Sequence, residues 1–171
     1  MSDMLVKLYD LPEALPGLER LTAAGVRVER ALASDKHAIV DYVRAQFSAG
    51  WASECDVAFS NRPTSCFIAV KDGTVVGFAC YDVTAKGLFG PLGVTESFRG
   101  KGIGKTLLLK CLLSMREEGY AYAIISWVGA AEFYRRTVGA QVIEDSFPGV
   151  YRRSIGIDKV LERERSSDEL T

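Results

Sequence analysis

One stretch decides the fold of this chain: Leu92-Gly93-Val94-Thr95-Glu96-Ser97-Phe98-Arg99-Gly100-Lys101-Gly102-Ile103-Gly104-Lys105. The apolar segment Gly87–Val94 predicts a buried strand, and the residues from Gly102 to Glu118 carry apolar side chains at helical spacing. The glycines therefore lie where a strand turns into the start of a helix. Backbone N–H groups are unpaired there and carry partial positive charge, which favours phosphate binding. Glycine allows a phosphate to approach the backbone closely.

The spacing of these glycines excludes two common nucleotide-binding motifs. The pattern reads Arg-x-x-Gly-x-Gly from Arg99 through Gly102 to Gly104, which is neither G-x-x-x-x-G-K-[ST] nor G-x-G-x-x-G. Taken alone, the triplet is a weak motif, and a glycine-rich turn without a ligand is the alternative. Its position between an apolar strand and an amphipathic helix favours the phosphate-binding interpretation.

Helical and strand-like segments alternate along the rest of the chain. Asp72-Gly73 lies between two apolar runs and predicts a tight hairpin. Trp51–Phe59 is either a short helix or an ordered loop. The remaining expected strands are Leu5–Tyr9, Val26–Leu32, Ser65–Lys71, Thr74–Val83, Tyr120–Trp127, Ala140–Ile143 and Val150–Ile155, and the remaining expected helices are Pro12–Ala24, Ser34–Phe47 (with Ser34 as N-cap) and Ala130–Thr137. This order predicts an α/β protein, in the sense of an α+β mixed sheet with helices on both faces.

Length and composition indicate one globular domain. The chain has 171 residues, of which 48% are hydrophobic and 25% charged. We expect an N-terminal strand and helix extension over 1–25, a main domain over 26–157 and a charged tail over 158–171. The apolar leucines of 1–25 imply that this segment packs on the domain or forms a homodimer contact. The net charge of −1 shows no basic footprint for nucleic acid.

The cysteine content and the N-terminal sequence indicate the cellular compartment and whether a metal site is expected. With one histidine, four cysteines and no C-x-x-C, the sequence predicts no metal site, and buried free thiols suit a reducing compartment. We find no run of about 18 apolar residues and no signal-peptide pattern. A cytoplasmic protein without membrane contact is the expectation.

Around the glycine turn, the sequence resembles the GNAT N-acetyltransferase superfamily. The matching pieces are Leu92–Val94, Arg99–Gly104, Tyr120–Trp127 and Ala130–Arg136, and the resemblance covers roughly Val26 to Gly156. It implies a GNAT-like acyltransferase fold with a mostly antiparallel central sheet, so that 26–157 would be the acetyltransferase domain. It also implies acetyl-CoA as cosubstrate and an amine of a small molecule or peptide as acceptor.

The resemblance assigns roles to individual residues. The pyrophosphate of acetyl-CoA would meet the backbone amides of Gly100, Lys101, Gly102, Ile103, Gly104 and Lys105, next to Arg99. The exposed backbone at Leu92, Gly93 and Val94 would hold the pantetheine arm and polarise the thioester carbonyl. Tyr134 would be the general acid for the leaving thiolate. Two departures stand out, because Trp127 replaces an asparagine of the family pattern and the spacing from Tyr134 to Gly139 is one residue longer.

No motif identifies the general base or the acceptor. An amine with a pKa near 10.4 must lose a proton before it attacks. Glu54 and Asp56 lie where the family places acceptor-binding elements, so we select them as candidate catalytic carboxylates. Solvated acids are the alternative. The chain is then an N-acetyltransferase working by direct transfer, and the alternative from another class is a non-catalytic acyl-CoA-binding or sensing module.

Overall fold

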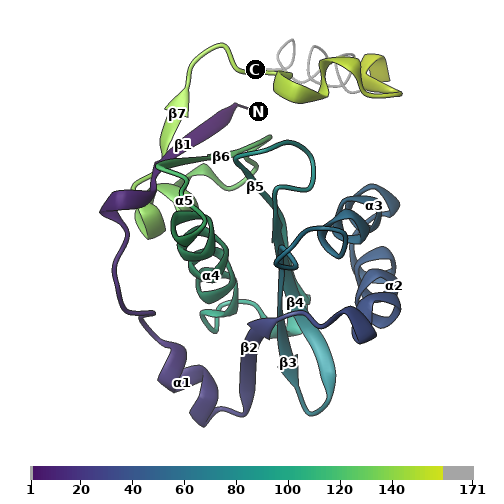
Figure 1. The fold of residues 1–171 in the computed structure, drawn as a ribbon, viewed down its shortest axis with the longest axis vertical. Helices are drawn as coiled ribbons and strands as arrows, with labels where there is room; N and C mark the ends of the chain where they lie inside the picture. The colour runs from purple at the N-terminus through teal and green to yellow at the C-terminus, as the bar shows by residue number, and fades with distance from the viewer. Residues whose placement is uncertain (1, 160–171) are drawn as a thin grey trace.

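A seven-stranded sheet forms the centre of the computed structural model, which describes residues 2–159 (Figure 1). The strand order is β2-β3-β4-β5-β6-β1-β7. Neighbouring strands are antiparallel except β5 and β6, which run parallel. The bounds are β1 (Asp3–Lys7), β2 (Val26–Arg30), β3 (Cys66–Lys71), β4 (Thr74–Tyr81), β5 (Leu88–Val94), β6 (Tyr122–Ile125) and β7 (Gln141–Ile143). The predicted fold class, a mostly antiparallel mixed sheet, is confirmed.

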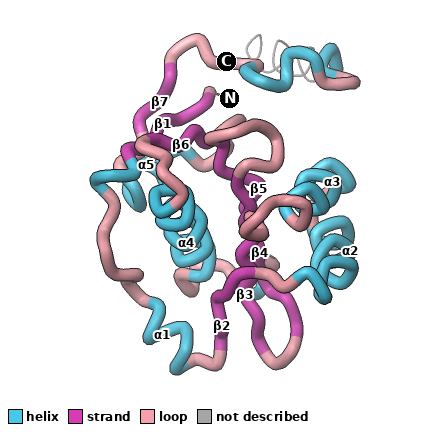
Figure 2. Tube along the Cα trace, viewed as in Figure 1, coloured by secondary structure: helices cyan, strands magenta, loops and turns pink. Residues whose placement is uncertain are grey.

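Helices cover both faces of this sheet (Figures 1 and 2). The helices are α1 (Leu18–Ala23), α2 (Lys36–Gln46), α3 (Ala49–Ala58), α4 (Ile103–Glu117) and α5 (Ala131–Val138). α2 and α3 lie on one face, where they enclose one apolar cluster with β3 and β4. α4 lies on the other face and belongs to the larger cluster, and most of its side chains are buried. No helix among residues 2–159 is long and apolar enough to cross a membrane.

The N-terminal strand is an interior strand of the sheet. β1 pairs with β6 on one side and with β7 on the other, both antiparallel. Met4, Val6 and Leu8 are buried to 1% exposure or less. The expected strand over Val150–Ile155 is wrong, because Gly149–Arg153 forms a short 3-10 helix instead. The position beside β6 is taken by β1, and β7 ends the sheet, so residues after 149 add no further strand.

Two helix boundaries also differ from expectation. Residues 12–17 form turns, and α1 begins only after Gly17, which has a left-handed φ of 86°. Ser34 does not cap α2, because residues 33–35 form a 3-10 turn first. The ambiguous segment after Gly50 is helical, since Ser48 accepts a hydrogen bond from the Trp51 amide at 3.1 Å and caps α3. The charged tail expected over 158–171 lies almost wholly outside the described residues.

Candidate active site

The sheet opens where β5 and β6 part. These strands pair only through Leu88 with Ile124 and Phe89 with Ile125. β6 then ends, whereas β5 continues to Val94. The side of β5 that faces away from β4 is therefore free from Gly90 onward. Two cavities lie along this free side, one toward the glycine turn and one toward the end of β6.

The glycine turn presents free backbone amides. Gly100 and Gly102 have φ of 73° and 89°, which bends the chain into the start of α4. The amide of Thr106 donates to the Gly102 carbonyl at 3.1 Å and closes the first helical turn. The amides of 103–105 precede that bond and have no partner inside the helix. A β-carbon at Gly100 or Gly102 would meet no heavy atom within 4 Å, so open space lies before the turn.

A cavity of about 540 Å³ adjoins this turn. Of the residues expected to contact the cofactor, eight line it: Leu92, Gly93, Val94, Arg99, Gly100, Gly102, Ile103 and Gly104. Lys101 and Lys105 do not. The Lys101 ammonium folds back onto the Ser97 carbonyl at 3.2 Å, and the Arg99 Nε donates to the Val94 carbonyl at 3.1 Å. The Val94 carbonyl is therefore already paired within the protein.

Phe47, which the sequence predicts only as the last residue of a helix, forms a wall of this first cavity. A β-carbon at Gly93 would lie 2.5 Å from the Phe47 Cζ atom, so only glycine lets the ring rest on β5. The Phe47 ring also packs on Trp51, with ring centroids 5.4 Å apart. Phe47 and Trp51 thus close the side of the cavity that faces α3.

A second cavity, of about 450 Å³, shares Trp51, Leu92, Ala130 and Tyr134 with the first. Glu54 lines this cavity, and its Oε1 atom accepts hydrogen bonds from Thr84 Oγ1 at 2.6 Å and from the Tyr151 hydroxyl at 3.1 Å. The structure thus brings Glu54 and Tyr134 to one cavity. The hydrogen bonds from Thr84 and Tyr151 hold the Glu54 carboxylate in place.

Asp56 lies elsewhere. Its Oδ1 atom forms an ion pair with the Lys36 ammonium at 2.9 Å, and the Asp56 side chain is 51% exposed. It lines neither of the two cavities. The ion pair joins α2 to α3 on the surface.

Tyr134 stands at the junction of the two cavities. Its ring packs edge-on against Phe89 and Phe133, with centroids 6.4 Å and 5.0 Å away. Its hydroxyl makes no hydrogen bond to residues 2–159. Burial raises the pKa of Tyr134 to about 12, because the charged phenolate would lose its hydration. The hydroxyl is thus a protonated donor that is free to meet a ligand.

Trp127 also lines the second cavity and takes an unusual backbone conformation. Its φ is 48°, in the left-handed region that non-glycine residues rarely occupy. Its amide donates to Asp3 Oδ1 at 3.1 Å, and its indole Nε1 donates to the Pro148 carbonyl at 3.0 Å. The Tyr151 ring packs on the indole, with centroids 4.4 Å apart. The N-terminal strand, which carries Asp3, thus fixes a cavity wall.

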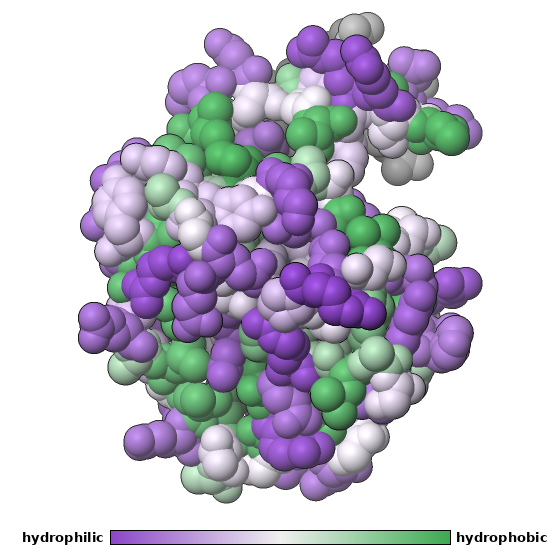
Figure 3. All heavy atoms as spheres, in the orientation of Figure 1, coloured by the Kyte–Doolittle hydropathy of each residue, from purple (hydrophilic) through white to green (hydrophobic). Residues whose placement is uncertain are grey.

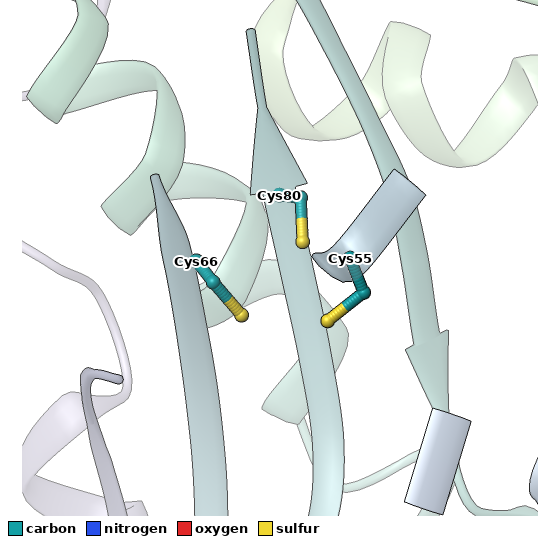
Figure 4. A group of neighbouring side chains, drawn as sticks. All are labelled: Cys55, Cys66 and Cys80. Carbon is teal, nitrogen blue, oxygen red and sulfur yellow. The ribbon is translucent and has the colours of Figure 1, made fainter. Parts of the chain in front are cut away.

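Three buried cysteines form the only metal-compatible group of side chains found within residues 2–159. The sulfur atoms of Cys55, Cys66 and Cys80 lie within 4.8 Å of one another, between α3 and the strands β3 and β4 (Figure 4). All are free and fully buried. Burial raises the pKa of the Cys80 thiol well above its usual range. A protonated thiol of this kind packs as a small apolar side chain, and all three cysteines belong to the apolar cluster that α2 and α3 form with β3 and β4.

Comparison with solved structures shows the fold. A GCN5-related glucosamine N-acetyltransferase region of a fungal multi-domain GH3 β-N-acetylglucosaminidase matches with a TM-score of 0.67 at 15% identity, over 83% of this chain and 19% of that one. A GCN5-related N-acetyltransferase from Sphaerobacter thermophilus matches with a TM-score of 0.58 at 23% identity, over 83% and 48%. One from Kribbella flavida matches with a TM-score of 0.51 at 22% identity, over 82% and 53%. The chain thus spans from a fifth to about half of these structures.

Comparison at the level of sequence shows the family. No curated protein sequence matches the chain. The sequence model of the Acetyltransferase (GNAT) family matches residues 36–140, from the start of α2 to just before β7. This range contains the free side of β5, the glycine turn, Glu54 and Tyr134. The chain therefore belongs to the acetyltransferase (GNAT) family.

Proposed function

We propose that the chain transfers the acetyl group of acetyl-CoA directly to a primary amine, with both substrates bound at once. The observation that carries the proposal is the meeting of two cavities at Tyr134. One cavity ends at a turn of unpaired amides that suits a pyrophosphate, and the other holds a carboxylate that suits an ammonium group. The joint between them is where acetyl donor and amine would meet.

The first cavity is the proposed acetyl-CoA site. Backbone amides over 100–105 would receive the pyrophosphate, because they lie at a helix N-terminus that borders the first cavity. The free side of β5 at Leu92 and Gly93 would pair with the pantetheine arm. An N–H group on that side would polarise the thioester carbonyl and stabilise the oxyanion of the tetrahedral intermediate.

Glu54 and Tyr134 have different roles in the proposed reaction. Glu54 holds the substrate ammonium, and the ammonium loses its proton to solvent through a water bound beside the Glu54 carboxylate. The free amine then attacks the thioester carbon and the C–N bond forms. The attacking nitrogen loses its second proton to solvent, and the C–S bond breaks to release the CoA thiolate. Tyr134 donates a hydrogen bond to the sulfur as charge develops there. Asp56 has no part in this scheme, because its ion pair with Lys36 lies outside both cavities.

We also propose that the protein works in a reducing compartment such as the cytoplasm. Within the described residues all four cysteines are free and buried, and the three in the cluster would be close enough for oxidation to disturb α3. Neither the proposed reaction nor the residues of the two cavities require a metal ion.

A matched pair of glycine variants tests the cofactor site. Gly102→Ala and Gly119→Ala both place a side chain at positive φ, 89° and 99°, with no neighbour within 4 Å, at opposite ends of α4. Both variants should lose about 1–2 kcal/mol of folding free energy. Only Gly102→Ala should weaken acetyl-CoA binding, by about 10-fold or more, because the methyl group stands where the phosphate approaches.

Calorimetric titration of both folded variants with acetyl-CoA measures this difference. Equal affinities in Gly102→Ala, Gly119→Ala and the unaltered chain would overturn the assigned site. Thiol release from acetyl-CoA in the presence of amines measures the transfer itself. Tight binding without thiol release for any amine would identify a non-catalytic acyl-CoA-binding module.

A further inference from the structure

The second cavity carries a single charge sign. Glu54 is its one charged lining residue, and no lysine, arginine or histidine of the described chain lines it. In the space-filling view the surface is hollowed between the segment after β7 and helix α3 (Figure 3). A groove of about 290 Å³ lies between these elements and shares Trp51, Glu54, Trp127 and Tyr151 with the cavity. It too is lined by no basic residue of the described chain.

Aromatic rings form the walls of this cavity. Trp51 comes from α3 and Trp127 from the segment after β6, and Tyr134 and Tyr151 line the same cavity. Faces of aromatic rings attract cations, most strongly for tryptophan, and also accept apolar groups. The walls therefore suit a cation with an apolar body, whereas they offer a carboxylate or phosphate no opposite charge.

One polar atom of the cavity is unused by the protein. The Ser126 hydroxyl is buried and has no hydrogen-bond partner among the described residues. Ser126 directly follows β6 and lines the same cavity. A buried hydroxyl without a partner costs free energy unless a ligand or a water satisfies it. It is a second, neutral point of polar recognition beside the Glu54 carboxylate.

We propose that the acceptor is a monoamine with a positively charged ammonium group, an apolar and preferably aromatic body, and no carboxylate or phosphate. The proposal rests on the acetyl transfer inferred above and names its substrate class. Glu54 meets the ammonium group, Trp51 and Trp127 enclose the body, and the Ser126 hydroxyl pairs with a neutral polar group of the ligand. An acidic acceptor would leave its anion unpaired next to Glu54, which opposes binding.

A matched pair of probes tests this class. 2-Phenylethylamine and phenylalanine share the amine and the ring and differ by one carboxylate. We expect kcat/KM for 2-phenylethylamine to exceed that for phenylalanine by about 100-fold or more, which corresponds to about 2.7 kcal/mol of lost interaction. A KM for phenylalanine equal to or lower than that for 2-phenylethylamine would overturn the proposal.

Binding can be read without turnover, because both tryptophans of the chain line this cavity. With CoA bound, 2-phenylethylamine should change tryptophan emission with saturation, and phenylalanine should not. Saturable binding of 2-phenylethylamine without acetyl transfer would refute the proposed reaction and leave the ligand class standing. Faster acetyl transfer to phenylalanine or to a phosphorylated amine than to 2-phenylethylamine would refute the ligand class and support the proposed reaction. Absence of any 2-phenylethylamine binding would overturn the ligand class.

The variant Trp127→Leu tests whether the acceptor binds in the second cavity. Leucine keeps a β-carbon at the same left-handed position, so the backbone strain is unchanged, but the aromatic wall is lost. KM for 2-phenylethylamine should rise about 10-fold, while acetyl-CoA affinity stays the same because Trp127 does not line the first cavity. Tyr9→Leu, an exposed aromatic outside both cavities, is the matched control and should change neither value. An unchanged KM in a folded Trp127→Leu protein would contradict the role of this wall.

Discussion

Tyr134→Phe removes one hydroxyl at the junction of the two cavities and keeps the ring that packs on Phe89 and Phe133. Burial raises the Tyr134 pKa to about 12, whereas an ordinary thiol has a pKa of about 8.5. Complete proton transfer from tyrosine to the thiolate would thus be uphill by about 3.5 pKa units, or roughly 4.8 kcal/mol. Tyr134 should therefore act as a hydrogen-bond donor to the developing thiolate, and the thiolate takes its proton from solvent afterwards.

The size of the effect follows from this role. A hydrogen bond to a charged group contributes about 1.5–3 kcal/mol. Its loss in the transition state should lower kcat by about 10- to 150-fold, with little change in acetyl-CoA affinity. Because the pKa is raised, the hydroxyl stays protonated through the range where an ordinary tyrosine, near pH 10, would ionise. The ratio of kcat between the unaltered chain and Tyr134→Phe should thus stay constant from pH 7 to about pH 10.5.

Steady-state thiol release at saturating acetyl-CoA and amine measures both quantities. Tyr122→Phe, which removes the hydroxyl of an exposed tyrosine that lines neither cavity, is the matched control and should leave kcat within twofold. A kcat within twofold in Tyr134→Phe as well would show that Tyr134 only packs. A kcat ratio that collapses toward one as the pH passes 10 would show that the hydroxyl ionises there, against the buried environment described above.

Three further outcomes are expected. Asp56→Asn should keep kcat within twofold while Glu54→Gln lowers it at least 10-fold, and equal losses in thiol release would contradict the role assigned to Glu54. Met4→Ala should lower the free energy of unfolding, measured by urea titration, by about 2–5 kcal/mol, because Met4 is buried in the core. The exposed control Asp10→Ala should lower it by less than about 0.5 kcal/mol. Similar losses in the two variants would show that β1 is not part of the core. The four cysteines should react with a thiol reagent only as fast as the protein unfolds, and rapid reaction of the native protein would refute their burial.

The sequence predicts best what depends on neighbouring residues. Apolar periodicity locates most helices and strands, and Asp72-Gly73 predicts the hairpin because both residues must take positive φ, 49° and 74°. The glycine turn is predicted for the same reason, since Gly100 and Gly102 form a bend that only local chemistry determines. Eight of the ten expected cofactor residues line the first cavity for this reason.

The parts of the site that the sequence does not predict depend on contacts between residues far apart in the chain. Phe47 reaches the first cavity only because Gly93, on another element, leaves room for its ring. Tyr151 reaches Glu54 only because the segment after 149 turns back across the site instead of forming a strand. Glu54 and Asp56 are two residues apart on α3 and so face different sides of the helix, one into a cavity and one to Lys36. Their spacing alone does not tell which faces inward.

The interior position of β1 has a consequence for the order in which the molecule forms during synthesis. Asp3 and its partner Trp127 are 124 positions apart, so the first strand leaves the ribosome long before either of its neighbours. At about 5–20 residues per second, the apolar side chains of β1 wait roughly 6–25 s for β6. Pairing over such a separation closes a long loop and is slow. The wall at Trp127 is therefore completed only after β6 has been synthesised, and an incompletely folded chain exposes an apolar strand until then.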